Sequence, residues 1–192
     1  LNFAWSNRQM ITHWTRKSFE RVFDQTESDL DMNLVYDVAH NIAKVEKHKV
    51  NGEERKLVVH RKGATRAFPS NRAEIPSKYR DLGQPVLVPG SMGTSSWILL
   101  GKSNSMDLSF GSTAHGAGRT MSRSKARRNF TEENVKKSLN DKGIFIKALT
   151  RDGVVEETPE AYKDVDSVVN VSHNLGIATK VAKLVPIGVI KG

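Results

Sequence analysis

Apolar residues near the start of the chain recur at steps of three and four, which is the spacing of an amphipathic helix. They are Phe3, Met10, Trp14, Phe19, Val22 and Phe23. A second apolar set over residues 34–45 continues the same spacing. The pattern therefore predicts helical structure over residues 1–47.

From residue 47 the sequence pattern changes. Asn51-Gly52 is a tight-turn dipeptide between residues 48–50 and 56–60, which predicts a β-hairpin followed by a basic loop at 61–66. Further strands are predicted at residues 84–89, 96–100, 107–110, 143–147, 154–157 and 186–191. Helices are predicted at residues 121–128, 131–139, 159–162 and 167–184. Because strands and helices alternate irregularly, the prediction is an α+β fold of mixed β-sheets with packed helices.

Charge and cysteine content narrow the class of protein. The 192 residues carry a formal charge of +9, and the isoelectric point is near 9.8. Such an excess of cations favours a polyanionic partner, although a protein that is merely basic fits equally well. The absence of cysteine excludes disulfides and thiolate metal sites. With no apolar run of about 18 residues and no signal peptide, the sequence predicts a cytoplasmic protein without a membrane partner. A first residue of Leu1 suggests a fragment or a processed piece.

Two loops of small residues could hold a phosphate group. In residues 111–119, His115 is followed by Gly116, Ala117 and Gly118, which allow the backbone to approach a ligand closely. Residues 89–96 have the same character but lack the Gly-Lys-Ser/Thr of a P-loop. Taken singly, each loop fits an ordinary glycine-rich turn. Two of them in one basic chain favour a nucleotide site.

Asp37 and His40 stand at positions i and i+3, on one face if a helix persists there. This spacing suits a divalent metal, but it equally suits a salt bridge or a helix cap. A complete transition-metal site needs three or more ligands, and the sequence does not visibly contain them.

Six segments together carry a family resemblance. In chain order they are residues 2–8, 37–44, 60–66, 89–93, 112–119 and 188–192. They resemble the RtcB family, the GTP- and manganese-dependent RNA ligases of tRNA splicing and RNA repair, and the sequence looks like an archaeal member. The resemblance implies that residues 1–192 are the C-terminal portion of a larger single catalytic domain.

The resemblance implies an activity and its cofactors. RNA ending in a 2′,3′-cyclic phosphate or 3′-phosphate, such as a tRNA half or a broken RNA end, would be joined to a 5′-hydroxyl end. His115 matches the family's nucleophile, which attacks the α-phosphate of GTP and becomes guanylylated. GTP and Mn²⁺ are the implied cofactors. The resemblance leaves open whether an activating protein is required.

The family's site residues carry over position by position. His40 matches a manganese ligand, and Asp37 is then expected to support structure. The implied nucleotide contacts are His40, Asn41, Pro89, Gly90, Ser91, Met92, Ser96, His115, Gly116, Ala117, Gly118, Tyr162 and Lys191. The expected RNA phosphate contacts are Lys62, Arg66, Arg119 and Arg123.

One departure from the family pattern is serious. The family's remaining metal ligands, a cysteine and two histidines among them, lie upstream of the residues present here. This segment alone is therefore expected to be inactive and to work with the missing N-terminal part. Two other readings remain open: a non-catalytic basic RNA-binding module, and a metal-dependent phosphatase or nuclease that uses His40 and Asp37.

Overall fold

A computed structural model describes residues 2–191, and these form two compact units that divide after Asp37. In the first unit, helix α1 (Asn2–Phe23) leaves its apolar side chains exposed, and none of its described residues is buried. The chain then returns along α1: Arg16 donates to the Met32 carbonyl at 2.8 Å, and Arg8 donates to Asp37 at 2.6 and 2.9 Å. The predicted helix is confirmed as far as Phe23.

Beyond Phe23 the predicted helix is wrong. Residues 33–39 have no regular secondary structure, and residues 41–50 form a strand. The apolar residues of this stretch do not share a helical face, since Val45 is exposed and stands opposite Val58 of the next strand. Strand pairing, which local spacing does not reveal, decides the structure here.

The predicted hairpin is confirmed. Strands β1 (Asn41–Val50) and β2 (Glu53–Lys62) pair antiparallel along their whole length. Asn51 and Gly52 both adopt positive φ, 52° and 86°, as a two-residue hairpin turn requires. Alternate residues face opposite sides.

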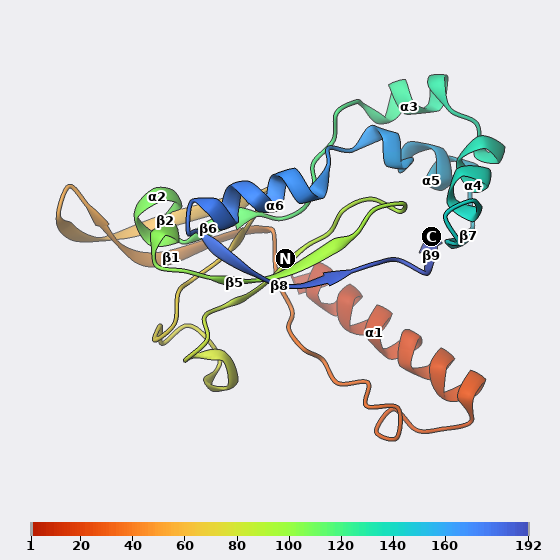
Figure 1. Ribbon diagram of the computed structural model, residues 1–192. Helices are drawn as coiled ribbons and strands as arrows, with labels where there is room; N and C mark the ends of the chain where they lie inside the picture. Colours follow the sequence, from red (N-terminus) through yellow and green to blue (C-terminus); the bar gives the residue numbers. More distant parts are fainter. Residues whose placement is uncertain (1, 192) are drawn as a thin grey trace. The chain divides into compact units, whose positions relative to one another are not determined.

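A three-stranded antiparallel sheet forms the centre of the second unit. Its order is β4 (Pro85–Val88), β5 (Ser96–Gly101), β8 (Ala178–Leu184), and α6 (Val165–Asn174) covers one face (Figure 1). The buried core comprises Ala67, Val86, Val88, Leu99, Ala117, Val165, Val169 and Ala178. The strands expected at 84–89 and 96–100 are confirmed.

The helix predicted over 167–184 is right only in its first half. The chain leaves α6 through Gly176, at φ 65°, and then forms β8 on the free edge of β5. A left-handed residue ends the helix, and sheet pairing takes the apolar residues that follow.

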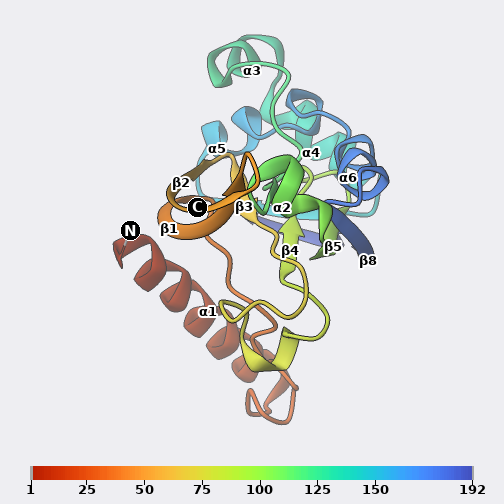
Figure 2. The ribbon, with the colours of Figure 1, turned by 90° about the vertical axis from the view of Figure 1, so that its left-hand side faces the viewer.

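A second strand pair links β3 (Ala64–Arg66) to β6 (Ser112–Ala114), and α2 (Asn104–Ser109) contacts β6. Both β3 and α2 are labelled in Figure 2. A single 3₁₀ turn, η1, covers Ser77–Tyr79. The strand predicted at 107–110 is wrong, because α2 occupies most of it. Phe110 and Gly111, at φ 49° and 64°, then reverse the chain into β6.

The remaining elements pack around a smaller core of Met92, Val135, Leu139, Ile144 and Val154. They are α3 (Arg123–Asn129), α4 (Glu132–Asn140), β7 (Phe145–Ala148), α5 (Arg151–Glu156), η2 (Pro159–Ala161) and β9 (Gly188–Lys191). Strands β7 and β9 pair in parallel.

Most predictions in this region are confirmed, including the Thr131 N-cap, whose hydroxyl accepts from the Asn134 amide. The strand predicted at 154–157 is wrong, because a capped helix, α5, buries Val154 and Val155 there. The α+β class is confirmed. Among the described residues, no helix is long and apolar enough to cross a membrane.

Candidate functional site

Two histidines from separate segments stack on each other. His40 immediately precedes β1 and His115 immediately follows β6. Their ring centroids lie 4.8 Å apart with an interplanar angle of 16°. Gly63, at φ 74° just after β2, lies beside them, and a Cβ added there would meet Cε1 of His115 at an ordinary 3.8 Å. Strand pairing thus brings two imidazoles, 75 residues apart in the sequence, to one place.

The loop after His115 is fixed at both ends but keeps donors available. The Ala117 amide donates to the Pro89 carbonyl, and the Lys163 amide donates to the Gly118 carbonyl, both at 2.9 Å. Within residues 2–191, the amides of Gly116 and Gly118 donate to no protein acceptor. Free amides beside an imidazole can bind the oxygens of a phosphate group.

The loop between β4 and β5 is held differently. The Ser91 amide donates to the Thr94 hydroxyl at 2.7 Å, and the Gly90 amide faces the Ser96 hydroxyl at 3.4 Å. The amides of Gly90 and Ser91 therefore donate within the loop, whereas the sequence suggested that this loop could hold a phosphate group. Gly90 has no room for a side chain, because an added Cβ would lie 2.2 Å from the Ser95 carbonyl oxygen.

Replacing Gly90 with alanine is therefore expected to lower the free energy of unfolding by about 1–3 kcal/mol, because the loop backbone must move. Gly188→Ala is the matched control: its added Cβ would meet the Phe145 carbonyl at an ordinary 3.5 Å, and the change should stay within about 0.5 kcal/mol. Urea unfolding of both variants measures the difference. Equal losses would contradict this account of the loop.

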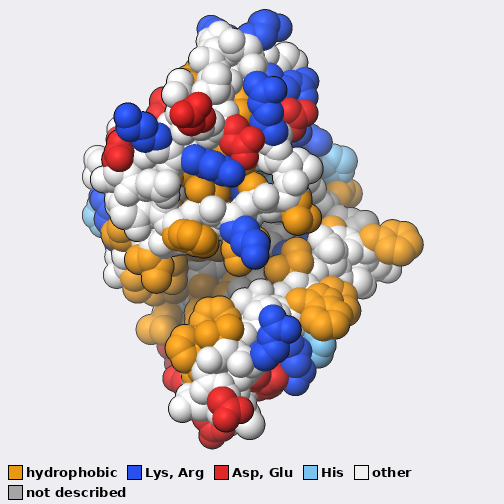
Figure 3. Space-filling model, turned by 90° about the vertical axis from the view of Figure 1, so that its right-hand side faces the viewer, with side chains coloured by type: hydrophobic (Ala, Val, Ile, Leu, Met, Phe, Trp, Pro, Cys, Tyr) orange, Lys and Arg blue, Asp and Glu red, His pale blue; other side chains and the backbone are white. Residues whose placement is uncertain are grey.

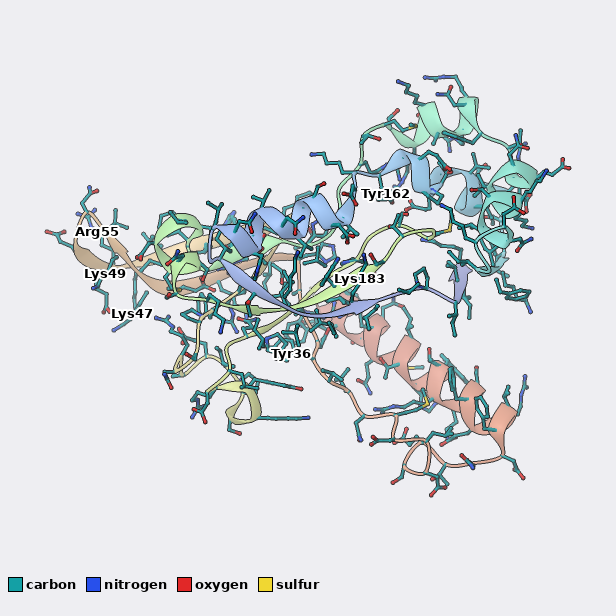
Figure 4. All side chains as sticks on the ribbon, viewed as in Figure 1. Tyr36, Lys47, Lys49, Arg55, Tyr162 and Lys183 are labelled. Atoms are coloured by element: carbon teal, nitrogen blue, oxygen red, sulfur yellow. The ribbon has the colours of Figure 1, made fainter. Side chains whose placement is uncertain are left out.

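Tyr162, which is labelled in Figure 4, forms a β-bridge with Arg119, the residue after Gly118, and the amide of the following Lys163 donates to the Gly118 carbonyl. Its ring packs against the central core, and its hydroxyl donates to Glu157 and accepts from Arg119 at 3.1 Å. Burial, and then the neighbouring Glu157, raise the pKa of Tyr162, and Arg119 opposes this only in part. The phenol therefore stays neutral and offers a flat, partly apolar face.

The structure brings His40, Pro89, the His115 loop and Tyr162 together through these contacts. Asn41 begins β1 opposite Lys62, and Lys191 lies on β9 opposite Ala148.

Met92 is buried in the smaller core. The roles in nucleotide binding that the family resemblance implies for these residues and for Met92 stay predictions.

Of the four residues expected to contact RNA, two arginines donate hydrogen bonds within the protein, and the other two cations are exposed. Arg66 donates to Gln84 at 2.9 Å, and Arg119 donates to the carbonyls of Met121 and Glu156 at 3.0 and 2.6 Å. Arg123 is exposed near two glutamates, and Lys62 is exposed at the end of β2. Charges of both signs lie side by side on the face that carries α3 to α5 (Figure 3).

The residues that the structure describes do not form a complete metal site. Among the described residues, no group of three or more histidine, aspartate or glutamate side chains could hold a metal ion. The helical face expected for Asp37 and His40 does not exist, and the Asp37 carboxylate is instead paired with Arg8.

A buried ion pair that is absent from the sequence-based predictions supports the strand that leads to His115. Arg61 donates to both oxygens of Glu46 at 2.8 Å, to the Ser112 hydroxyl at 2.8 Å and to the Phe110 carbonyl at 2.9 Å. Ser112 begins β6, three residues before His115. The pair therefore ties the hairpin to the strand that leads into the site.

The charge state of this pair follows from its contacts. Burial alone would raise the pKa of Glu46, but hydrogen bonds from Arg61 and His48 hold it below its ordinary value. The sequence did contain a signal: a turn at 51–52 puts residues 46, 48 and 61 on one face of the hairpin. The basic loop predicted at residues 61–66 is wrong, because residues 61–62 end β2 and residues 64–66 form β3, which pairs with β6.

An imidazole beside free amides can act as a nucleophile on a phosphoryl group whose oxygens those amides bind. The family model "tRNA-splicing ligase RtcB" matches residues 1–192. The chain belongs to the RtcB family.

Proteins that carry the same name are among its relatives. The chain is 59% identical over 191 residues to tRNA-splicing ligase RtcB of Aeropyrum pernix and 56% identical over 191 residues to that of Thermococcus kodakarensis. All of the chain is covered in both cases, and it spans 40% of the length of each relative. For Pyrococcus abyssi, identity is 56% and the chain spans 21% of the relative. The chain corresponds to the C-terminal part of these proteins.

Proposed function

We propose that this chain is the C-terminal portion of a GTP-dependent RNA ligase. It would join RNA 2′,3′-cyclic phosphate or 3′-phosphate ends to 5′-hydroxyl ends, as in tRNA splicing and RNA repair. The observation that carries the proposal is the stacked pair His40–His115 beside the free amides of Gly116 and Gly118. Relatives named tRNA-splicing ligase support it.

In the first step, a neutral ring nitrogen of His115 attacks the α-phosphorus of GTP. A P–N bond forms, the P–O bond to the β-phosphate breaks, and pyrophosphate leaves. Imidazole suits this step, since it is nucleophilic near neutral pH and its phosphoramidate is reactive enough to pass the nucleotide on. The amides of Gly116 and Gly118 would stabilise the charge that develops on the phosphoryl oxygens.

The remaining steps return His115 to its free state. A 2′,3′-cyclic phosphate end is first opened by water, which breaks the bond from phosphorus to O2′ and leaves a 3′-phosphate and a 2′-hydroxyl. An oxygen of the RNA 3′-phosphate then attacks the phosphorus of the guanylylated histidine and displaces the imidazole, which leaves GMP on the RNA end. The 5′-hydroxyl then attacks the RNA phosphate, GMP leaves, and a phosphodiester forms. Tyr162, with its neutral and partly apolar ring, would pack on guanine.

His40 is the residue that would hold Mn²⁺ at this place. When bound, the metal supplies positive charge that neutralises the phosphoryl oxygens and the leaving pyrophosphate. One imidazole beside His115 is an incomplete donor set, so the other ligands would come from the N-terminal part of the enzyme. Activity is accordingly expected only when that part is supplied.

A joining assay tests the proposal. The chain, with the N-terminal part supplied, is incubated with RNA bearing a 2′,3′-cyclic phosphate and RNA bearing a 5′-hydroxyl. Joined RNA is expected only when GTP and Mn²⁺ are both present. Salt-sensitive RNA binding without joining would support a non-catalytic RNA-binding module instead. Phosphate release without joining would support a phosphatase, a role that the Arg8–Asp37 pair disfavours by occupying one candidate ligand.

A further inference from the structure

The side of the β1–β2 hairpin that faces away from the buried ion pair is a basic surface. We call it the outer face, and its ten residues are Asn41, Ala43, Val45, Lys47, Lys49, Glu54, Lys56, Val58, His60 and Lys62. All ten are exposed. Four lysines stand against one glutamate, so the outer face carries a net positive charge.

The outer face belongs to a long hairpin that is anchored to the rest of its unit. Each strand has ten residues and therefore extends roughly 33 Å. On the opposite face, Glu46 and Arg61 anchor the hairpin to β6. Within the described chain the two strands pair only with each other. Lys47 and Lys49 lie near the distal end of the hairpin, as Figure 4 shows.

The outer face leads directly to the candidate site. Its proximal end is Asn41 opposite Lys62, and these residues adjoin His40 and Gly63. Lys56 is six residues from Lys62, or roughly 20 Å along the strand, and stands opposite Lys47. Lysines thus lie at the distal and at the proximal end of the outer face, and the proximal end adjoins the candidate site.

Between the cations lies an apolar pair. Val45 and Val58 face each other across the strands and are 67% and 62% exposed. A surface with cations at intervals and apolar side chains between them complements a single-stranded polynucleotide, whose phosphates alternate with sugars and bases. An acidic protein surface would not require the exposed valines.

The other basic segment of the chain is less suited to this role. In α3, Arg123 and Arg127 lie against Glu156, so nearby carboxylates offset their charges. On the outer face, Lys47 contacts Glu54 at 2.9 Å. Because Glu54 is one carboxylate against four lysines, the outer face keeps a net positive charge.

We propose that the outer face binds the sugar–phosphate backbone of the RNA strand whose end reacts at His115. The proposal rests on the proposed RNA ligase function and adds the path of the strand. Lys62 holds a phosphate nearest the reacting end, and Lys47, Lys49 and Lys56 hold phosphates farther along. The contacts are electrostatic and independent of base sequence.

The test is a triple variant, Lys47→Gln, Lys49→Gln and Lys56→Gln, in the chain with the N-terminal part supplied. A matched control, Lys78→Gln, Lys102→Gln and Lys142→Gln, removes the same charge from exposed positions elsewhere. Binding of single-stranded RNA of about 16 nucleotides with a 2′,3′-cyclic phosphate end is titrated between about 50 and 200 mM salt. Labelling of the protein by [α-³²P]GTP is measured in parallel.

The triple variant is expected to bind RNA at least about 10-fold more weakly at 100 mM salt, and its slope of log K against log salt should fall by about 2. Guanylylation should stay unchanged, and the control variant should match the wild type in both measurements. Equal RNA affinity and slope in both variants would overturn the outer-face proposal while leaving guanylylation intact. Absence of guanylylation in the wild type would instead refute the proposed function.

Discussion

Replacing His115 with alanine is expected to reduce covalent labelling of the protein by [α-³²P]GTP by at least about 10³-fold, since the variant has no nucleophile to form the P–N bond. The chain with the N-terminal part and Mn²⁺ supplied should give a label that acid removes, as expected of a phosphoramidate. His115 is half-buried at the surface of a loop, so its removal should leave the fold intact. Quantifying the label after denaturing electrophoresis measures the effect.

His173→Ala is the matched control for this prediction. His173 is an exposed histidine on α6, near Thr179 at 3.5 Å, and its removal should leave labelling unchanged. Acid-stable labelling that persists in His115→Ala would show that another residue carries the nucleotide, and the assignment of His115 would fall.

Replacing Arg61 with alanine should lower the free energy of unfolding by about 3–5 kcal/mol, because Glu46 would keep a buried charge without its partner. The hydroxyl of Ser112 would also lose its donor. Without Arg61, burial would act with less opposition and raise the pKa of Glu46. Urea unfolding at neutral pH measures the loss.

Arg55→Ala provides the comparison, since Arg55 lies on the same strand but pairs with Glu53 at the surface. Its loss should cost no more than about 0.5 kcal/mol. The double variant Glu46→Leu, Arg61→Met should recover part of the stability, because apolar groups can replace a buried ion pair. An Arg61→Ala variant as stable as Arg55→Ala would mean that the pair does not hold the hairpin to β6.

The fold was predictable wherever local chemistry was decisive. The Asn51-Gly52 turn, the Thr131 cap and the strand at 85–88 all follow from residues adjacent in sequence. The errors fall where pairing with distant segments decides. Residues 41–47 and 178–184 have spacings that suit a helix, but each becomes a strand beside a partner that spacing does not identify.

The candidate site was predictable in its parts and not in its arrangement. The small residues around His115 and Pro89 are visible in the sequence, and the family resemblance assigns them roles. The hydrogen bond from Ala117 to Pro89, which joins the two loops, requires the folded chain. Arg66 and Arg119 are expected from the sequence to contact RNA phosphates, but in the structure both donate to groups within the protein.

By itself, the sequence determined the α+β class, the basic character, the family and the identity of His115 as the candidate nucleophile. Tertiary structure decided which groups surround it: His40 against its ring, free amides at Gly116 and Gly118, and Arg61 behind its strand. The physical reason is that residue type and short-range spacing fix the chemistry of a side chain. Strand register between segments far apart in the chain fixes which side chains meet.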